Sequence, residues 1–313
     1  MPRLRRKHTP SPSDWFDDVP VLARMTPDAA AGKLIEMGED QAAASLLASA
    51  SSGARSFGLR DMLGLDRGWK NSAHAFGHIE NGPLEMLPII QAGQVEPDLT
   101  LKNERIKISL GRLVAVDYPG AGKHVVLCDF YAQHQLPKEV EHLHYNTLVR
   151  VSEGQDAGVL NYPLFVGLKV GNEGVVFKGM TVNVKNVEDE AMLGFLESET
   201  FRTGLQLLNA VQPALAPFSV MAVSLTKAIA QRNRNVAVQE FQMGLDFVKQ
   251  PYGACLREGA YVAVQIPKQL SQTWDWHDWT FDYKRGQVVK REAPDQGIPY
   301  NYVVVTVSRF SGS

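Results

Sequence analysis

The sequence contains little cysteine, no long apolar run and no excess of charge of either sign. Its 313 residues include two cysteines, Cys128 and Cys255, so a disulfide framework does not hold the fold together. No stretch of about 18 or more strictly apolar residues occurs, which argues against a classical membrane-spanning helix. The start of the chain also lacks the apolar run of a signal peptide. We therefore expect a cytoplasmic protein with buried, reduced thiols.

The charge balance is close to neutral. The chain has 32 Lys and Arg against 34 Asp and Glu, which gives a formal net charge of -2. A general electrostatic attraction to nucleic acid is therefore not expected. An apolar content of 44% is enough for a substantial core in a chain of this length.

Composition divides the chain into three regions. Residues 1–25 are rich in Pro, Ser and basic residues, which predicts a flexible arm. Residues 26–103 open with Thr26 as a candidate N-cap and Pro27 at the first helical position, and many alanines follow. Frequent Gly and Pro then interrupt any long element. We expect a small helical, loop-rich region here, followed by a larger domain over residues 104–313.

Strand signals dominate from residue 104 onward. Runs such as RIKISLGRLVAVD and YNYVVVTVSRF are rich in β-branched residues, and Gly, Pro, Asn and Asp separate them. Short strands with this punctuation predict a mainly β fold, an antiparallel β-sandwich. A helical segment at about 189–232 interrupts the series, and Pro213 and Pro217 predict its division into an inserted pair of helices.

The stretch DYPGAGKHVV, which begins at Asp117, is similar in composition to a phosphate-binding loop. That loop requires Gly, four further residues, Gly-Lys-Ser/Thr and then a helix. Here Asp117 replaces the first Gly, His124 replaces the hydroxyl residue, and an apolar run typical of a strand follows. Pro119 with Gly120 and Gly122 fits a tight turn instead. We predict a hairpin and do not expect a nucleotide as ligand.

Histidine and glutamate gather in one stretch of the chain. His142 and His144 would share one side of a strand, and His134, Glu139 and Glu141 lie close to them in sequence. Histidine and carboxylate ligands with an open position for water form catalytic zinc sites. One alternative is therefore a metal-dependent hydrolase built on these five residues.

Three tryptophans stand close together in the stretch WDWHDWTFD. Trp274, Trp276 and Trp279 combine large apolar area with a polar N–H group, a composition favoured at interfaces. Strand alternation would place Trp274 and Trp276 on the same face. Two interpretations stay open: an interaction surface, and closure of one end of the sandwich core.

A window of the helical segment, residues 203–226, carries no charged residue. The window is long enough to cross a bilayer as a helix of about 20 residues, but its prolines and amides favour a buried helical hairpin. Leu215, Phe218 and Met221 are its candidate contact residues. A second alternative is a conditionally membrane-inserting effector that releases residues 203–230, with the N-terminal region as a removable cover.

These patterns favour a non-enzymatic binding or effector module. Neither cysteine has a basic residue close enough along its strand to activate it, and the G-x-S-x-G elbow of serine hydrolases is absent. The leading prediction is that sandwich loops and the inserted helices bind another protein, without a cofactor. The metal-dependent hydrolase and the membrane-inserting effector are the two alternatives.

Overall fold

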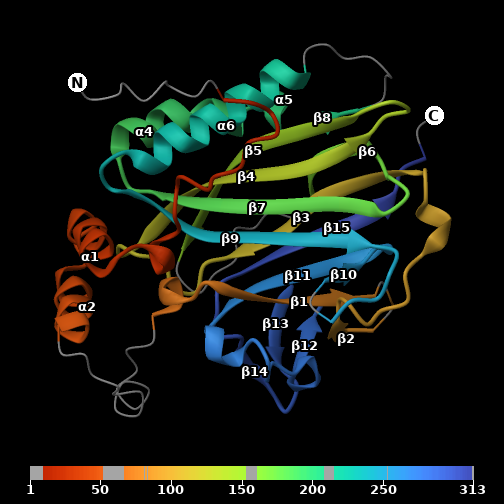
Figure 1. The fold of residues 1–313 in the computed structure, drawn as a ribbon. Helices are drawn as coiled ribbons and strands as arrows, with labels where there is room; N and C mark the ends of the chain where they lie inside the picture. Colours follow the sequence, from red (N-terminus) through yellow and green to blue (C-terminus); the bar gives the residue numbers. More distant parts are fainter. Residues whose placement is uncertain are drawn as a thin grey trace.

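Two β-sheets packed face to face make up most of the protein. The computed structural model describes residues 10–51, 67–80, 82, 84–152, 161–207, 215–251 and 253–311. Within these residues the strands form one sheet of ten strands and one of five (Figure 1). The predicted mainly β fold with two sheets and a few helices is confirmed.

The smaller sheet has the strand order β10-β9-β7-β4-β5. Neighbouring strands are antiparallel except the short β10, which runs parallel to β9. Its strands are β4 (Lys123–Gln135), β5 (Val140–Ser152), β7 (Gly174–Val184), β9 (Asn235–Asp246) and β10 (Ala254–Cys255).

The larger sheet has the strand order β14-β13-β12-β2-β1-β11-β15-β3-β6-β8. Neighbouring strands in this sheet are antiparallel, except that the two-residue β8 runs parallel to β6. The strands are β1 (Ala73–Ile79), β2 (Met86–Gln91), β3 (Arg105–Val114), β6 (Tyr162–Lys169), β8 (Leu205–Gln206), β11 (Gly259–Ile266), β12 (Trp279–Asp282), β13 (Gln287–Lys290), β14 (Ala293–Gly297) and β15 (Tyr302–Arg309).

The main core lies between the two sheets. From the larger sheet, β3 contributes Ile106, Ile108 and Leu110, and from the smaller sheet β4 contributes Val126 and Phe130. All of these side chains are buried. Because a strand directs alternate side chains to opposite faces, the intervening residues of β4 point to the outer face of the five-stranded sheet.

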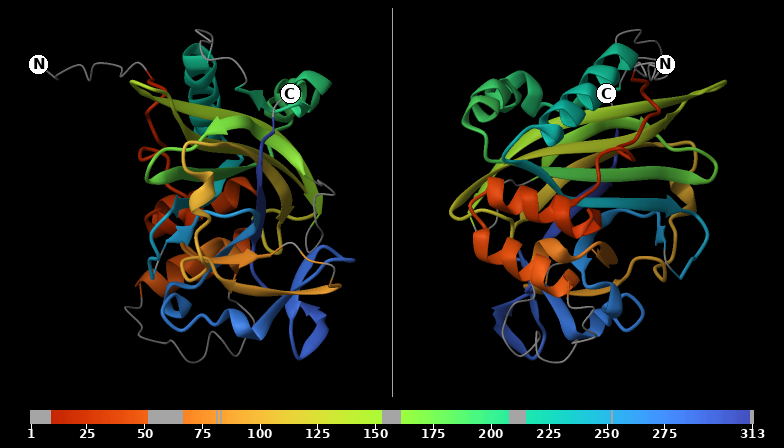
Figure 2. Two further views of the ribbon diagram at one scale, coloured as in Figure 1. Left: turned by 90° about the vertical axis from the view of Figure 1, so that its right-hand side faces the viewer. Right: turned by 60° about the vertical axis from the view of Figure 1, so that its left-hand side comes forward.

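Helices cover that outer face. α4 (Val187–Leu193), the 3-10 turn η4 (Gly194–Glu197), α5 (Glu199–Arg202) and α6 (Leu215–Gln231) lie along it, and Figure 2 shows them on the same side of the sheet from two further directions. Leu193, Leu196, Val223 and Ile229 from these helices pack with Leu127 of β4 in a second apolar cluster. The sheet is therefore buried on both faces over this half.

The expected helical pair at 189–232 is realised as three short helical turns and one long helix. Leu205, expected in the first helix, lies in the two-residue strand β8 instead. Pro217 falls in the first turn of α6, where its missing N–H has no helical partner to lose. The break expected at Pro213 lies outside the described residues.

At the start of the chain, α1 (Pro27–Glu36) and α2 (Asp40–Ser51) confirm the expected N-terminal helices. Thr26 is the N-cap of α1, as predicted, and its hydroxyl oxygen accepts a hydrogen bond from the Ala29 N–H at 3.4 Å. Thr26 is a favourable cap because its oxygen satisfies a backbone donor that has no partner within the helix.

Residues 10–25 form a strap across the outer face of the five-stranded sheet, drawn in red in Figure 1. Phe16, Val19 and Val21 of this N-terminal strap are buried in the second apolar cluster. The indole N–H of Trp15 donates to Oε1 of Glu240 on β9 at 2.5 Å. The flexible arm expected over residues 1–25 is therefore wrong for this part, because an aromatic pair and two valines give it apolar area to bury.

The link between β3 and β4 is an arch between the two sheets and not the predicted hairpin. β3 pairs with β15 and β6, whereas β4 pairs with β5 and β7. Gly120 and Gly122 do adopt positive φ, at +87° and +86°, as expected of a turn. The turn was predicted correctly, but the hairpin was not, because turn residues do not determine whether the two flanking strands pair with each other.

Side chains from several elements hold this arch in place. The Asn183 amide donates to the Pro119 carbonyl at 2.7 Å, and the Lys185 ammonium donates to the Ala121 carbonyl at 3.0 Å. The Gly120 N–H donates to Glu39 Oε1 at 3.0 Å. The arch runs directly into strand β4, with no helix after it. An anion-binding loop needs free backbone N–H groups at a helix N-terminus. Here Glu39 accepts from the Gly120 N–H, and a strand follows the arch, so both observations argue against an anion site.

Strands β1 and β2 lie in a stretch that the sequence patterns describe as a loop-rich connector. β1 pairs along its whole length with β11, and it carries His74 and His78. Gly77 lies between these two histidines. A glycine in a strand permits the close approach of another group, and here that group is the Trp276 ring.

Trp276 belongs to a third apolar cluster on the far face of the larger sheet. A Cβ atom at Gly77 would lie 2.9 Å from the Trp276 ring and 2.5 Å from Ile89 Cγ2. Real Cβ contacts are not this short, so the absence of a side chain at Gly77 makes room for the tryptophan.

We predict that Gly77→Ala lowers the free energy of unfolding by about 1–3 kcal/mol, because the added methyl group overpacks this contact. Urea denaturation followed by circular dichroism measures the change. Gly32→Ala is the matched control: its Cβ meets nothing within 4 Å, and it lies in α1, where Ala is favoured over Gly by about 0.5–1 kcal/mol. An unchanged midpoint for Gly77→Ala would contradict the tight packing of Trp276.

Candidate functional site

A buried polar network joins the five-stranded sheet to α6 and to the N-terminal strap. The Asp129 carboxylate on β4 accepts from the His144 ring at 2.7 Å through one oxygen. Its other oxygen accepts from the Asn146 amide and the Thr226 hydroxyl, both at 2.9 Å. These side chains are buried. Each donor comes from a neighbouring strand or from α6, so the carboxylate is well hydrogen-bonded, as a buried charge requires.

The second nitrogen of the His144 ring faces the strap. His144 Nε2 lies 3.1 Å from the Asp14 carbonyl oxygen, and the Trp15 ring stacks on the imidazole with centroids 6.0 Å apart. The backbone N–H of His144 donates to the Ser219 hydroxyl oxygen at 3.1 Å. The aspartate–histidine pair is thus enclosed by the strap and α6, and it joins elements of the fold to one another.

An exposed apolar patch lies on the inserted helices. Phe195 contacts Phe201 with ring centroids 5.2 Å apart, and Phe201 contacts Phe218 at 6.2 Å. Met192 and Met221 stand three residues from Phe195 and Phe218, and residues three apart on a helix are neighbours. Met192, Phe195 and Met221 are 45%, 43% and 50% exposed. We call these five residues the Met–Phe patch.

Carboxylates are frequent in the segment that carries Met192, Phe195 and Phe201. Glu188 and Glu199 are exposed at the ends of the α4–α5 segment. Glu190 and Glu197 lie between them and pair with Arg150 of β5, with a distance of 3.0 Å from Glu197 Oε1 to Arg150 Nε. Arg150 offsets Glu190 and Glu197, and Arg202 is exposed beside Phe201, so the acidic border of the patch consists of Glu188 and Glu199 at the two ends of the segment.

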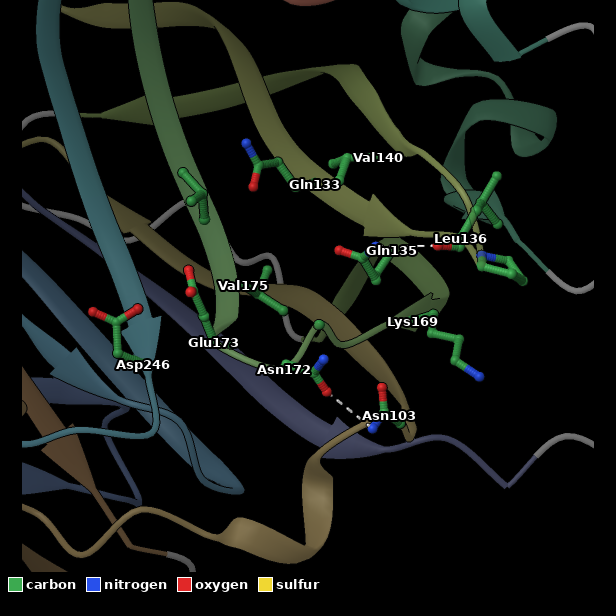
Figure 3. Close-up of a pocket in the computed structure, with 14 residues that line it drawn as sticks. Asn103, Gln133, Gln135, Leu136, Val140, Lys169, Asn172, Glu173, Val175 and Asp246 are labelled. Atoms are coloured by element: carbon green, nitrogen blue, oxygen red, sulfur yellow. Dashed lines mark hydrogen bonds between the residues drawn. The ribbon is translucent and has the colours of Figure 1, made fainter.

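A polar cleft opens at the end of the five-stranded sheet where β4 ends and β7 begins (Figure 3). Its volume is about 700 Å³. The ladder between β4 and β7 ends at the pair Ala132–Phe177, whereas β4 continues with β5 and β7 continues with β9. The two ribbons separate beyond this pair, and the turn between β6 and β7 borders the gap. Side chains that line the cleft include Asn103, Gln133, Gln135, Lys169, Asn172, Glu173 and Asp246.

The cleft is rich in amides and has carboxylates on one side. The Asn103 amide donates to the Asn172 side-chain oxygen at 3.2 Å, and the Gln135 amide donates to the Leu136 carbonyl at 3.1 Å (Figure 3). Burial raises the pKa of the Asp246 carboxyl, and the charge of Glu173 raises it further. Two carboxylates that interact in this way attract a cation.

The structure divides four of the five residues of the expected metal site between the two faces of a sheet. His142 and His144 do share the outer face, as predicted from strand alternation, but His134 and Glu141 stand opposite each other in the register and face inward. Glu139 lies in the turn before β5. The His142 ring bonds the Tyr131 hydroxyl at 2.6 Å. Among the described residues no group of three or more His, Cys, Asp or Glu could hold a metal ion.

The three tryptophans lie in the third apolar cluster. Trp276 is 3% exposed, so its indole is not available to a partner. Trp274 and Trp279 are half-buried and stack on each other with centroids 5.7 Å apart. Leu215, another expected contact residue, is also buried in a core. Phe218 and Met221 are the expected contact residues that reach the surface patch.

The described helices give no candidate for crossing a bilayer, since none of them is both long and apolar enough. The uncharged window at 203–226 does not form one helix: Leu205 and Gln206 are a strand, and α6 begins at Leu215. Burial raises the pKa of the Cys128 thiol, and the nearby Asp129 charge raises it further, so Cys128 is not an activated nucleophile.

We predict that Asp129→Ala lowers the free energy of unfolding by about 3–5 kcal/mol, because it leaves three buried donors on β5 and α6 without their acceptor. Urea denaturation measures the loss, and the milder Asp129→Asn serves if the alanine variant does not fold. Asp18→Ala is the control: Asp18 pairs with Lys227 at 2.9 Å but is 57% exposed, and exposed pairs contribute about 0–1 kcal/mol. Equal losses in both variants would contradict the role of the buried network.

Buried histidines predict that stability falls in mild acid. Burial lowers the pKa values of His78, His124 and His134 to about 4, below the unfolded value of about 6.5. The unfolded chain therefore binds these protons first, and stability is lost as the pH falls from about 6.5 towards 4. Urea midpoints at several pH values test this. His134→Gln should flatten the slope, in contrast to His277→Gln at a site that is 90% exposed.

Comparison of the chain with known proteins finds no relative. No protein-family model matches the chain, no curated protein matches it, and no solved structure matches it. The function is therefore argued from the surfaces of the chain itself, among them the Met–Phe patch and the polar cleft.

Proposed function

We propose that the protein is a non-enzymatic binding module whose inserted helices dock a partner protein at the Met–Phe patch. The observation that carries this proposal is the exposure of Met192, Phe195 and Met221 together with the ring contacts that join Phe195, Phe201 and Phe218. Single exposed apolar residues are normal, whereas contiguous groups of them mark interaction sites.

The chemistry of the patch favours a particular kind of partner. Methionine is unbranched and polarizable, so a Met–Phe surface adapts to apolar side chains of varied shape. An amphipathic helix presents such side chains at positions three and four apart. The acidic border formed by Glu188 and Glu199 would attract Lys or Arg on the flanks of that helix. The proposed partner element is a basic amphipathic helix.

The support beneath the patch favours docking over release. α6 is held to the sheet by the Thr226 hydroxyl bond to Asp129 and by buried Val223 and Ile229. A surface that keeps its shape loses less entropy on binding. The acidic border is also unfavourable next to anionic lipid, which favours a protein over a membrane as the ligand.

A direct test uses a fluorescein-labelled amphipathic peptide of Leu and Lys as the probe. Fluorescence anisotropy is expected to show saturable binding to the full-length protein and binding weaker by about ten-fold or more to Phe195→Ser/Met221→Ser, because a central apolar contact is lost. Leu99→Ser/Val248→Ser is the matched control, since Leu99 and Val248 are 58% and 68% exposed outside the patch. Circular dichroism establishes that all three proteins are folded.

Affinity capture with the same three proteins identifies the natural partner. A protein retained by the wild type and by the control but not by the patch variant, and rebinding when purified, supports the proposal. Identical capture by the patch variant overturns it. Flotation of the wild type with liposomes, lost in the patch variant, would favour the membrane-inserting effector instead.

A further inference from the structure

We propose that the polar cleft is a second binding site, which takes an extended peptide segment carrying a basic side chain. The site lies at the end of the five-stranded sheet, where β4 and β7 separate (Figure 3). It is independent of the Met–Phe patch, because it is built from strand ends and turns and shares no residue with the inserted helices.

The separated strands supply backbone hydrogen-bonding groups. Beyond Ala132–Phe177, residues 133–135 of β4 still pair with β5 on one side, and residues 174–176 of β7 still pair with β9. On their facing sides these residues have no ladder partner among the described strands. The Gly174 backbone is used by Gly171 in the adjoining turn. Such strand edges are templates for pairing with another extended chain.

The side chains of the cleft match the same ligand. Gln133, Gln135 and Asn172 each carry a donor and an acceptor on one amide. A peptide backbone presents both kinds of group at every residue other than proline. Amides can therefore bind the ligand's N–H and C=O groups where it passes beyond the reach of the strand edges.

The carboxylates add a preference for charge. Glu173 and Asp246 are close enough to interact, and the Asp246 carboxyl is held by the Gln250 amide at 2.9 Å. A Lys or Arg side chain of the ligand would relieve the repulsion between the two carboxylates and gain charge-assisted hydrogen bonds. The same pair disfavours a phosphate group on its side of the cleft, although Lys169 also lines the cleft.

The lining also distinguishes a peptide from a saccharide. The described residues that line the cleft include no aromatic ring on which the face of a sugar could stack. The apolar side chains there are aliphatic, Leu136, Val140 and Val176 among them. Aliphatic positions beside strand edges are suited to alternate side chains of an extended peptide.

A phage-displayed random heptapeptide library, selected on the full-length protein, supplies the probe. The selected peptides are expected to share a Lys or Arg at one position. The synthetic consensus peptide should bind by isothermal titration calorimetry, and Glu173→Gln/Asp246→Asn should weaken it by about ten-fold or more. Glu292→Gln/Asp295→Asn is the matched control. It also removes one Glu and one Asp charge, but near β14, away from the cleft (Figure 1).

Two further outcomes decide whether the backbone takes part. Two versions of the consensus peptide are made, one N-methylated at its odd positions and one at its even positions. One version should lose binding and the other should keep it, because alternate N–H groups of a paired strand face its neighbour. Equal binding of both N-methylated peptides, no consensus, or a consensus peptide unaffected by the cleft variant would each overturn the proposal. Glycan-array binding that the cleft variant loses would overturn it in favour of a saccharide. Phe195→Ser/Met221→Ser should leave peptide binding unchanged.

Discussion

The Asp129 carboxylate is the interaction on which the outer half of the protein depends. It accepts hydrogen bonds from a strand, from α6 and from the imidazole of His144, which in turn contacts the N-terminal strap. A buried charge is tolerated only with this many partners. One side chain therefore joins the strap to α6 and, through α6, supports Phe218 and Met221 of the Met–Phe patch.

Strand content could be predicted from the sequence because β-branched and apolar residues in β3, β4, β7, β9 and β15 occur in long runs bounded by Gly, Asn and Asp. The inserted helices and the cap at Thr26 were predicted on similar local grounds. Strands β1 and β2 could not be, because glycine and proline interrupt them, and their pairing with β11 and β12 joins distant parts of the chain. Propensity describes single segments, whereas pairing depends on tertiary context.

The candidate sites show the same limit. Alternation placed His142 and His144 on one face, but it could not show that Asp129 and Asp14 already occupy the His144 ring. Phe218 and Met221 were found because the window around them is apolar. The cleft gave no signal in the sequence: Gln133, Asn172 and Asp246 are ordinary polar residues, and only the separation of β4 from β7 brings them together.

The arch between β3 and β4 has a consequence for how the chain reaches its native state. Since β3 and β4 enter different sheets, they cannot form a local hairpin early in folding. The larger sheet instead depends on pairs of residues that are distant in the sequence, such as Ala73 with Ile266. Contacts between residues so distant in the chain must overcome a large loss of chain entropy before they contribute, which slows folding. Newly made chains would spend longer with unpaired strand edges exposed, and would depend on chaperones more than a protein of similar size made of local hairpins.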